Sequence, residues 1–270
     1  MLRTMRGRVD GMVVLSPDLG VEKLRSNLPE QLPVVLLNCA GDGYFESIRI
    51  DNHGGALAMT RHLLGLGHHR IAFIRGPARN HDAAERLRGY REGMRSRRAE
   101  WSASLEVPGD FQEEAGYRAA AKILKLRPRP TAVFAANDAM AIGLLCAFRE
   151  RKIRVPEDIA MGGFDDIPIA QYMTPSLTSV NVPIARLGSS AAERLLDAIR
   201  EEGQPKRQEI VEARLVVRQS CGASRLEATT PPSEGMGYEG RHGHCRESLG
   251  QASLEPSAAG RLRMRKEEGR

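Results

Sequence analysis

The sequence predicts an α/β fold built on parallel sheets. From residue 9 onward, short apolar runs alternate with stretches of helical period, as expected when parallel strands are joined by crossover helices. The runs at 9–15 (VDGMVVL) and 32–38 (LPVVLLN) are apolar almost throughout, which is typical of strands buried on both faces. A helical stretch over about 19–28 lies between them, so the chain opens on a strand-helix-strand unit.

The next unit is a short strand followed by an amphipathic helix. We expect the strand at 48–51 and the helix at 55–66, where Ala56, Met59 and Leu63 share one stripe and Gly67 closes the last turn. The rest of the chain continues the alternation. We expect further strands at 70–75, 131–136, 159–164, 177–181 and 209–218, and further helices at 83–97, 113–126, 138–151 and 183–202.

Composition limits the class of protein. The chain has 270 residues, of which 41% are hydrophobic, enough for one large domain or two small ones. The formal net charge is +6, but 40 Lys and Arg are interleaved with 34 Asp and Glu, so we interpret the charge as a solvated mixed surface and not as a nucleic-acid-binding face. The four cysteines are widely and irregularly spaced, which indicates reduced thiols rather than a disulfide framework.

The two ends of the chain give no sign of export or membrane insertion. The basic start, Met1 to Arg8, has no apolar region behind it, and no apolar run approaches the roughly 18 to 20 residues of a membrane span. From Ser224 onward there is no Ile, Val or Phe, so we expect residues 223–270 to be a disordered tail. His242, His244 and Cys245 lie close together there, but three possible ligands in such a tail are weak grounds for a metal site, and we expect none.

Several stretches, taken in order, carry a resemblance to a known family. They are VDGMVVLSP (9–17), DNHGGALAMTRHLLGLGHHRIAFIRGP (51–77), ERLRGYREGM (85–94), GDFQEEAGYRAA (109–120), PTAVFAANDAMAIGLLCAF (130–148), VPEDIAMGGFDDIPIAQYMTPSLTSV (155–180) and RLVVRQS (214–220). In sequence, order and spacing they resemble the bacterial transcription regulators of the LacI/GalR family. A single stretch such as GGFDD would be a weak match, whereas the whole series covers most of residues 9–222.

The resemblance implies a fold of two doubly wound parallel-sheet subdomains of the periplasmic-binding-protein-like type, joined by three crossovers, with a small effector in the cleft between them. Carried onto this chain, residues 1–67 with 182–204 form the N-terminal subdomain, and 68–181 with 205–222 form the C-terminal, effector-binding subdomain. Family members begin with a helix-turn-helix, a hinge helix and further strand-helix units, none of which precedes Val9 in this sequence. We therefore expect a truncated first subdomain with an exposed sheet edge and no DNA-binding head.

The strongest candidate ligand contacts match family motifs at strand ends. Arg86, in RLxG, would donate its planar guanidinium to ligand hydroxyls or a carboxylate, or is a surface arginine on an exposed helix face. Asp165, in GGFDD, would accept from the vicinal hydroxyls of a sugar, or forms an Asx turn or helix cap. Asn137, in AND, contacts ligand or caps the next helix. Phe111, in GDF, covers a pyranose or base, or packs in the core.

Further candidates lie in loops. Asp51 and His53 occupy a loop where family members place a polar contact, and the sequence leaves open which of the two points inward. Asn80 and Asp82 fall in the variable loop that tunes effector choice, and Ser16 follows the first strand. We expect no catalytic residue, no metal ligand and no cofactor.

The function implied is effector sensing. The resemblance points to the sensing domain of a cytoplasmic transcription regulator, a homodimer that binds a sugar-like metabolite and controls operator DNA allosterically through a head that this chain lacks. Helix 138–151 belongs either to the dimer face or to the core. The sequence names neither the effector nor the operator, and it leaves repressor and activator open.

Two other functions are alternatives. The first is a periplasmic-type sugar-binding protein of a transport system. The absent signal peptide argues against it, as does the regulator-like stretch at 155–180. An enzyme is not expected, because the adjacent carboxylates Asp165 and Asp166 in one loop tend to point apart, and the sequence has no nucleophile elbow or phosphate-binding loop.

Overall fold

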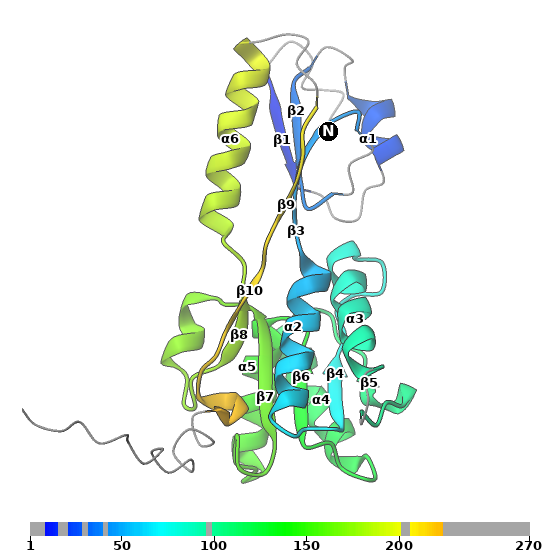
Figure 1. Ribbon diagram of the computed structural model, residues 1–270, viewed down its shortest axis with the longest axis vertical. Helices are drawn as coiled ribbons and strands as arrows, with labels where there is room; N and C mark the ends of the chain where they lie inside the picture. The colour runs from blue at the N-terminus through cyan, green and yellow to red at the C-terminus, as the bar shows by residue number, and fades with distance from the viewer. Residues whose placement is uncertain are drawn as a thin grey trace, which may run out of the picture. The chain divides into compact units, whose positions relative to one another are not determined.

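The computed structural model describes residues 9–15, 21–28, 32–39, 43–95, 99–200 and 206–223, and their strands form two sheets (Figure 1). The expected tail beyond Ala223 lies outside these residues. One sheet has four strands, all parallel. In spatial order they are β1 (Met12–Leu15), β2 (Val34–Leu37), β3 (Glu46–Ile50) and β9 (Gln208–Val211).

The second sheet has six strands and confirms the α/β prediction. Five of them are parallel, and β10 pairs antiparallel to β8 at one edge. In spatial order they are β10 (Arg214–Val216), β8 (Thr178–Asn181), β7 (Ala160–Asp165), β6 (Ala132–Ala135), β4 (Ile71–Ile74) and β5 (Glu106–Val107). Short 3₁₀ helices lie at η2 (Ala103–Leu105), η3 (Pro168–Tyr172) and η4 (Gln219–Cys221).

Helices cover both faces of the six-stranded sheet. Neighbouring glycines of β7 show this, because a Cβ on Gly162 would meet Met59 of α2 (Asn52–Gly65), whereas one on Gly163 would overlap the carboxylate of Asp138 in α5 (Asp138–Glu150). Successive strand residues point to opposite faces, so α2 and α5 lie on opposite sides. The helix α3 (His81–Met94) packs on α2, and α4 (Glu113–Lys125) packs on α5.

The four-stranded sheet is also covered on both faces. Val34 and Leu36 of β2 pack with Leu24 of α1 (Val21–Asn27), whereas Val35 between them belongs to the larger core cluster together with Leu187 of α6 (Ile184–Arg200). Both sheets are therefore doubly wound, as expected from the near-continuous apolar runs.

The chain changes from one sheet to the other at three short crossings. Asp51 joins β3 to α2, Val182–Pro183 join β8 to α6, and Glu212–Ala213 join β9 to β10. The boundaries expected at residues 67 and 205 do not coincide with these crossings. The stripe of α2 is apolar as expected, but it packs against β6, β8 and β10 of the six-stranded sheet. Sequence periodicity identifies a buried face and not the sheet that buries it.

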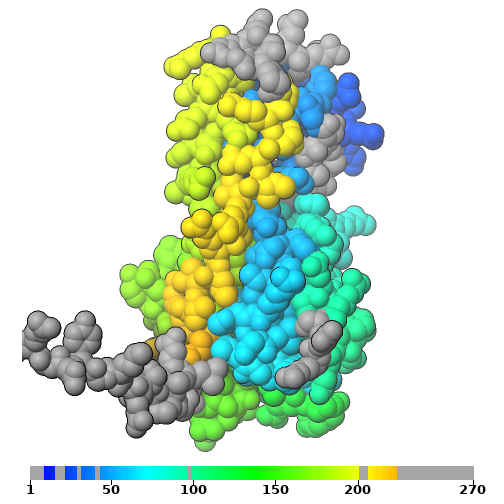
Figure 2. All heavy atoms as spheres, viewed as in Figure 1, coloured from blue at the N-terminus to red at the C-terminus, as the bar shows by residue number. Residues whose placement is uncertain are grey.

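The single strand expected at 209–218 is wrong. Residues 208–211 and 214–216 form β9 and β10, which belong to different sheets. Figure 2 shows this segment, yellow to orange, on the visible face of the molecule, where β10 lies beside α2. Both β9 and β10 are edge strands, so each has one paired side.

The strand β1 ends the four-stranded sheet on its other side. Its Val13 and Leu15 are 42% and 66% exposed, although both are large and apolar. An exposed apolar edge strand is a template for pairing with another chain. In the described part of the chain, β1 is therefore an edge strand with exposed apolar side chains.

Candidate functional site

The guanidinium of Arg86 is the centre of the candidate site. Arg86 lies in α3 and is only 6% exposed. Its Nε donates to Asn52 Oδ1 at 2.8 Å, and its Nη1 donates to the backbone oxygen of Ala136 at 2.7 Å. The same Nη1 lies 3.0 Å from Asp165 Oδ1. Nη2 takes part in none of these contacts. Arg86 is therefore a fixed, buried cation and not the surface arginine of the alternative interpretation.

Two aromatic rings flank this cation. The guanidinium carbon lies 3.8 Å from the ring centroid of Phe164 and 5.6 Å from that of Phe111. Stacking of a guanidinium on an aromatic face stabilises the charge when water is excluded. The rings and the partners of Nε and Nη1 together fix the plane of the guanidinium.

Asp165 ends β7 in an unusual backbone conformation. Its φ is 107°, in the region that favours glycine, and its backbone oxygen accepts from Val182. Burial raises the pKa of its carboxyl, and the charge and hydrogen bond of Arg86 act in the opposite direction. No Asx turn or helix cap is formed by this side chain, whose contact in the described structure is Arg86.

Asn137 and Phe111 are joined to each other. Asn137 Nδ2 donates to the backbone oxygen of Phe111 at 2.9 Å, and its Oδ1 accepts from Met140 N at 3.0 Å, so Asn137 is the N-cap of α5. Phe111 has a φ of 71°, and its half-buried ring lies against Gly76, where a Cβ would clash with it. Asn137 thus caps α5, and Phe111 packs partly in the core.

The remaining candidates divide between helix caps and a polar hollow. Asn80 caps α3 through Ala83 N, and Asp51 caps α2 through Gly54 N. His53 pairs with Glu92 at 2.8 Å. A hollow of about 230 Å³ lies beside them. Its lining is Asn38, Arg49, Ile50, Asp51, Asn52, His53, His81, Asp82, Glu85, Arg88 and Ile210.

The structure thus brings the candidates together in two groups. Arg86, Phe111, Asn137 and Asp165 form one continuous cluster, and Asp51, His53 and Asp82 line the hollow. Ser16 lies outside the described residues.

Asn52 connects the two groups and was missed by sequence reasoning. Its Nδ2 donates to Asp82 Oδ1 at 2.9 Å while its Oδ1 accepts from Arg86, and it is almost fully buried. An asparagine directly after Asp51 at the start of a helix looks like capping chemistry. Only its position beside the strand-to-helix crossing distinguishes it in the sequence.

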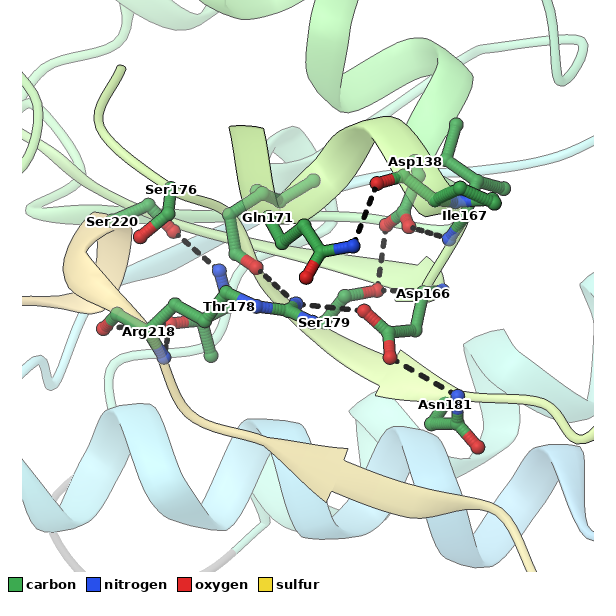
Figure 3. Close-up of polar contacts among 12 residues, drawn as sticks. Asp138, Asp166, Ile167, Gln171, Ser176, Thr178, Ser179, Asn181, Arg218 and Ser220 are labelled. Carbon is green, nitrogen blue, oxygen red and sulfur yellow. Dashed lines mark hydrogen bonds and ion pairs between the residues drawn. The ribbon is translucent and has the colours of Figure 1, made fainter. Parts of the chain in front are cut away.

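Asp138 and Asp166 are further polar residues that the sequence did not single out as part of the site. Asp138 looks like a cap or a first-turn acid, and it is the first-turn acid of α5, while Asn137 forms the cap. Figure 3 shows Asp138, Asp166 and Ser179 joined in one network at the end of β7. Burial raises the pKa of Asp138 to about 7, against the opposing hydrogen bonds from Ser179 and Ile167.

The chain is similar to known regulators and ligand-binding domains. The periplasmic binding protein-like domain matches residues 60–221. The HTH-type transcriptional repressor PurR of Proteus mirabilis (strain HI4320) is 38% identical over 219 residues, which are 79% of this chain and 63% of that relative. The chain thus spans less than two thirds of the length of this curated relative.

Solved structures give the same result. A complex of the transcriptional regulator CelR with cellobiose is 35% identical, with a TM-score of 0.72, over 80% of this chain and 68% of that chain. A LacI family regulator from Enterococcus faecium with bound ribose is 28% identical, with a TM-score of 0.74, over 80% of this chain and 81% of that chain.

The matches define the class first: this is a ligand-binding domain of the periplasmic-binding-protein-like kind. With 35% identity to a solved regulator over 80% of its length, the chain belongs to the LacI/GalR family of transcriptional regulators and holds the family's effector-binding core. The resemblance carried by the motifs is confirmed.

Two features are absent from the described residues. None of their helices has the length and apolar character needed to cross a bilayer. Likewise, they include no group of three or more His, Cys, Asp or Glu side chains placed to hold a metal ion.

Proposed function

We propose that this domain senses a small effector at Arg86 and Asp165. The observation that carries the proposal is the immobilised guanidinium: Nε and Nη1 are held by the protein, and Nη2 is in none of those contacts. A preorganised donor loses little entropy when it binds a ligand oxygen. Asp165, which pairs with this guanidinium, keeps a backbone conformation that favours glycine, and strained residues of this kind cluster at ligand sites.

The effector is sugar-like. Asp165 can accept from hydroxyl groups while Arg86 donates to them, and the ring of Phe111 can cover an apolar sugar face. Two of the solved relatives bind cellobiose and ribose. We assign Arg86, Phe111, Asn137 and Asp165 to the inner part of the site, with Asp51, His53 and Asp82 at its rim. Asn80 and Ser16 complete the candidate set. No cofactor or catalytic residue is needed.

The effector controls DNA binding in the full regulator. We propose two subdomains, one formed by residues 9–50 with 184–211 and the other by residues 52–181 with 214–223. An effector that binds between them would favour one relative orientation of the two subdomains. Operator DNA is contacted through a helix-turn-helix head such as the one that the HTH-type relatives are named for. We place this regulator in the cytoplasm and not among transport proteins or enzymes, because the relatives are transcriptional regulators.

The regulator is a homodimer in this proposal. The 3₁₀ helix η3 presents exposed Ile169 and Tyr172, which are large apolar residues on the surface of the six-stranded unit. We assign these residues and the exposed side of α5, around Cys146, to the dimer face.

Thermal unfolding with D-ribose and cellobiose tests the effector site. Saturation at a hundred times the dissociation constant should stabilise the fold by roughly 2.7 kcal/mol. We expect Arg86→Lys to remove this ligand-induced increase in melting temperature, because a lysine ammonium cannot reproduce the fixed, planar set of donors of a guanidinium. The control is Arg154→Lys, at an exposed ion pair with Asp158. If a sugar raises the melting temperature of wild type and of Arg86→Lys by the same amount, Arg86 is not a ligand contact.

A further inference from the structure

The turn that follows β7 is strained at two consecutive residues. Asp165 has a φ of 107° and Asp166 a φ of 53°, both in the region that side chains other than glycine rarely adopt. Residues in this conformation are strained and persist only where the surroundings hold them. The surroundings of this turn must therefore contain strong anchors.

The backbone amides of Asp166 and Ile167 are both hydrogen-bonded, directly or through one hydroxyl, to the carboxylate of Asp138. Ile167 N donates to Asp138 Oδ2 at 3.0 Å. Asp166 N donates to Ser179 Oγ at 3.1 Å, and this hydroxyl donates to Asp138 Oδ1 at 2.6 Å (Figure 3). One amide thus reaches Asp138 directly, and the other reaches it through Ser179.

The side chain of Asp166 supplies a second anchor. Its Oδ1 lies 2.7 Å from Arg218 Nη1, and its Oδ2 accepts from Asn181 Nδ2 at 3.0 Å. With Asp166 held in this way, Asp165 is the carboxylate of the turn that reaches Arg86.

Asp138 is buried against the strand that leads into this turn. It is fully buried, as is Ser179, and a Cβ on Gly163 would overlap its Oδ1, so the carboxylate lies directly on the β7 backbone. The helix that it begins is capped by Asn137. A buried carboxylate is unfavourable unless hydrogen bonds satisfy it, and the bonds it accepts here come from the turn and from Ser179.

We propose that Asp138 and Ser179 are a positioning pair for the effector site: they do not touch the ligand, but they hold the 165–167 turn so that Asp165 faces Arg86. This inference rests on the proposed role of Arg86 and Asp165. Losing either member of the pair releases one or both amides and lets the carboxylate of Asp165 move away from the ligand.

The charge of Asp138 matters for this role. An ionised carboxylate accepts on both oxygens, whereas the protonated acid turns one oxygen into a donor. The charged groups that face it are Asp165 and Asp166, which pair with Arg86 and Arg218. Because the pKa of Asp138 is raised to about 7, the turn is held most firmly above neutral pH. Effector affinity should therefore rise with pH across this range.

A pH titration without ligand tests the pair first. The amide ¹H and ¹⁵N shifts of Asp166 and Ile167 are followed from pH 5 to 9. In the wild type, both should change with one midpoint near 7. Asp138→Asn should abolish both transitions, and Ser179→Ala should abolish the one at Asp166 while keeping the one at Ile167. Asp158→Asn, at an exposed position, and Ser176→Ala, at a half-buried position outside the 165–167 turn, should leave both transitions in place.

Calorimetric binding of D-ribose and cellobiose at pH 6 and pH 8 follows. Asp138→Asn and Ser179→Ala should weaken binding about tenfold, as expected for the loss of one buried hydrogen bond, and Asp138→Asn should remove the difference between the two pH values. If Arg86→Lys abolishes binding and Asp138→Asn binds like wild type at both pH values, the positioning pair is refuted and the effector site stands. If no variant binds either sugar, the sugar assignment fails and the amide titration alone decides on the pair.

Discussion

At the scale of single residues, burial of Asp138 makes the stability of the fold depend on pH. The folded pKa is about 7 against an ordinary value of 3.8, chiefly because burial disfavours the charged form. Between these values the folded state binds more protons than the unfolded state, so the free energy of unfolding falls as pH rises. The stabilisation due to Asp138 is complete at acid pH and is lost progressively as pH rises through the folded pKa.

Asp138→Asn should remove this dependence. The free energy of unfolding is measured in urea at pH 5, 6, 7 and 8. Below pH 7, that of the wild type should fall by up to about 1.4 kcal/mol per pH unit relative to that of the variant. Asp158→Asn is the control, because ion pairing lowers the pKa of Asp158 to about 2 and its contribution is constant above pH 5. Parallel pH profiles for wild type and Asp138→Asn would contradict the prediction.

Tyr90 is a buried polar residue with a structural role. Its hydroxyl donates to the backbone oxygen of Ile71 at 2.8 Å, and its ring stacks on Phe73 with centroids 4.7 Å apart. Burial raises the pKa of the hydroxyl, which therefore stays a donor. We expect Tyr90→Phe to keep the stacking and to lower the free energy of unfolding by about 0.5–1.5 kcal/mol.

Chemical denaturation of wild type and Tyr90→Phe measures this effect. A Tyr90→Phe protein as stable as the wild type would show that the hydrogen bond to Ile71 contributes nothing net.

The sequence predicts some of the site residues and not others for a clear reason. Asn137 stands directly before a helix, so its capping role follows from local sequence. The caps at Asn80 and Asp51 are not predicted, because the sequence leads us to expect these helices to start only at 83 and 55. The bond from Ser179 to Asp138 joins residues 41 positions apart, and the bond from Arg86 to Asn52 joins residues 34 apart. Contacts of this range arise from topology, which local pattern does not encode. The ligand roles given to Arg86 and Asp165 came from the family resemblance.

At the scale of helices and strands, two glycines set how closely α4 and α5 pack. A Cβ on Gly116 would overlap the backbone oxygen of Met140, and one on Gly143 would overlap that of Glu113. Backbone atoms cannot turn aside as a flexible side chain does. The two helices are therefore in direct backbone contact at both points.

Gly143→Ala should force these helices apart and lower the free energy of unfolding by about 1–3 kcal/mol or more. Gly188→Ala in α6 is the control, because a Cβ at this position would meet nothing within 4 Å, and alanine should stabilise that helix by roughly 0.5–1 kcal/mol. Thermal and urea unfolding should show that Gly143→Ala lowers the free energy of unfolding and that Gly188→Ala raises it. A neutral Gly143→Ala would mean that the helices adjust without loss.

The elements were largely predictable, and their assignment to sheets was not. The strand runs and the helical stripes appear at their expected places, because burial on two faces requires apolar sequence. The exceptions are short: β5 has two residues, and η3 has five, too few for a periodic pattern. The division of 209–218 into β9 and β10 depends on which sheet edge is available, which is a property of the folded molecule.

At the scale of the whole molecule, the open edge at β1 should govern aggregation. Exposed Val13 and Leu15 lie on a strand with one unpaired side in the described structure. We expect the double substitution Val13→Lys with Leu15→Lys to suppress concentration-dependent aggregation, since charge on an edge strand blocks further pairing. Light scattering over a concentration series measures this.

The control for this experiment is Val217→Lys, which changes an exposed apolar residue away from β1. If Val217→Lys suppresses aggregation as strongly as the double substitution does, general surface charge and not the β1 edge is responsible.

The three crossings also limit how the length of this chain can change. Each is one or two residues long: Asp51, Val182–Pro183 and Glu212–Ala213. One inserted residue after Asp51 would turn α2 by about 100° about its axis, and one inserted beside Ala213 would reverse the faces of β9 or β10. Insertions and deletions at these positions should therefore prevent folding, whereas the loop before α3 should tolerate them. A library of single-residue insertions, screened for folded protein, would test this.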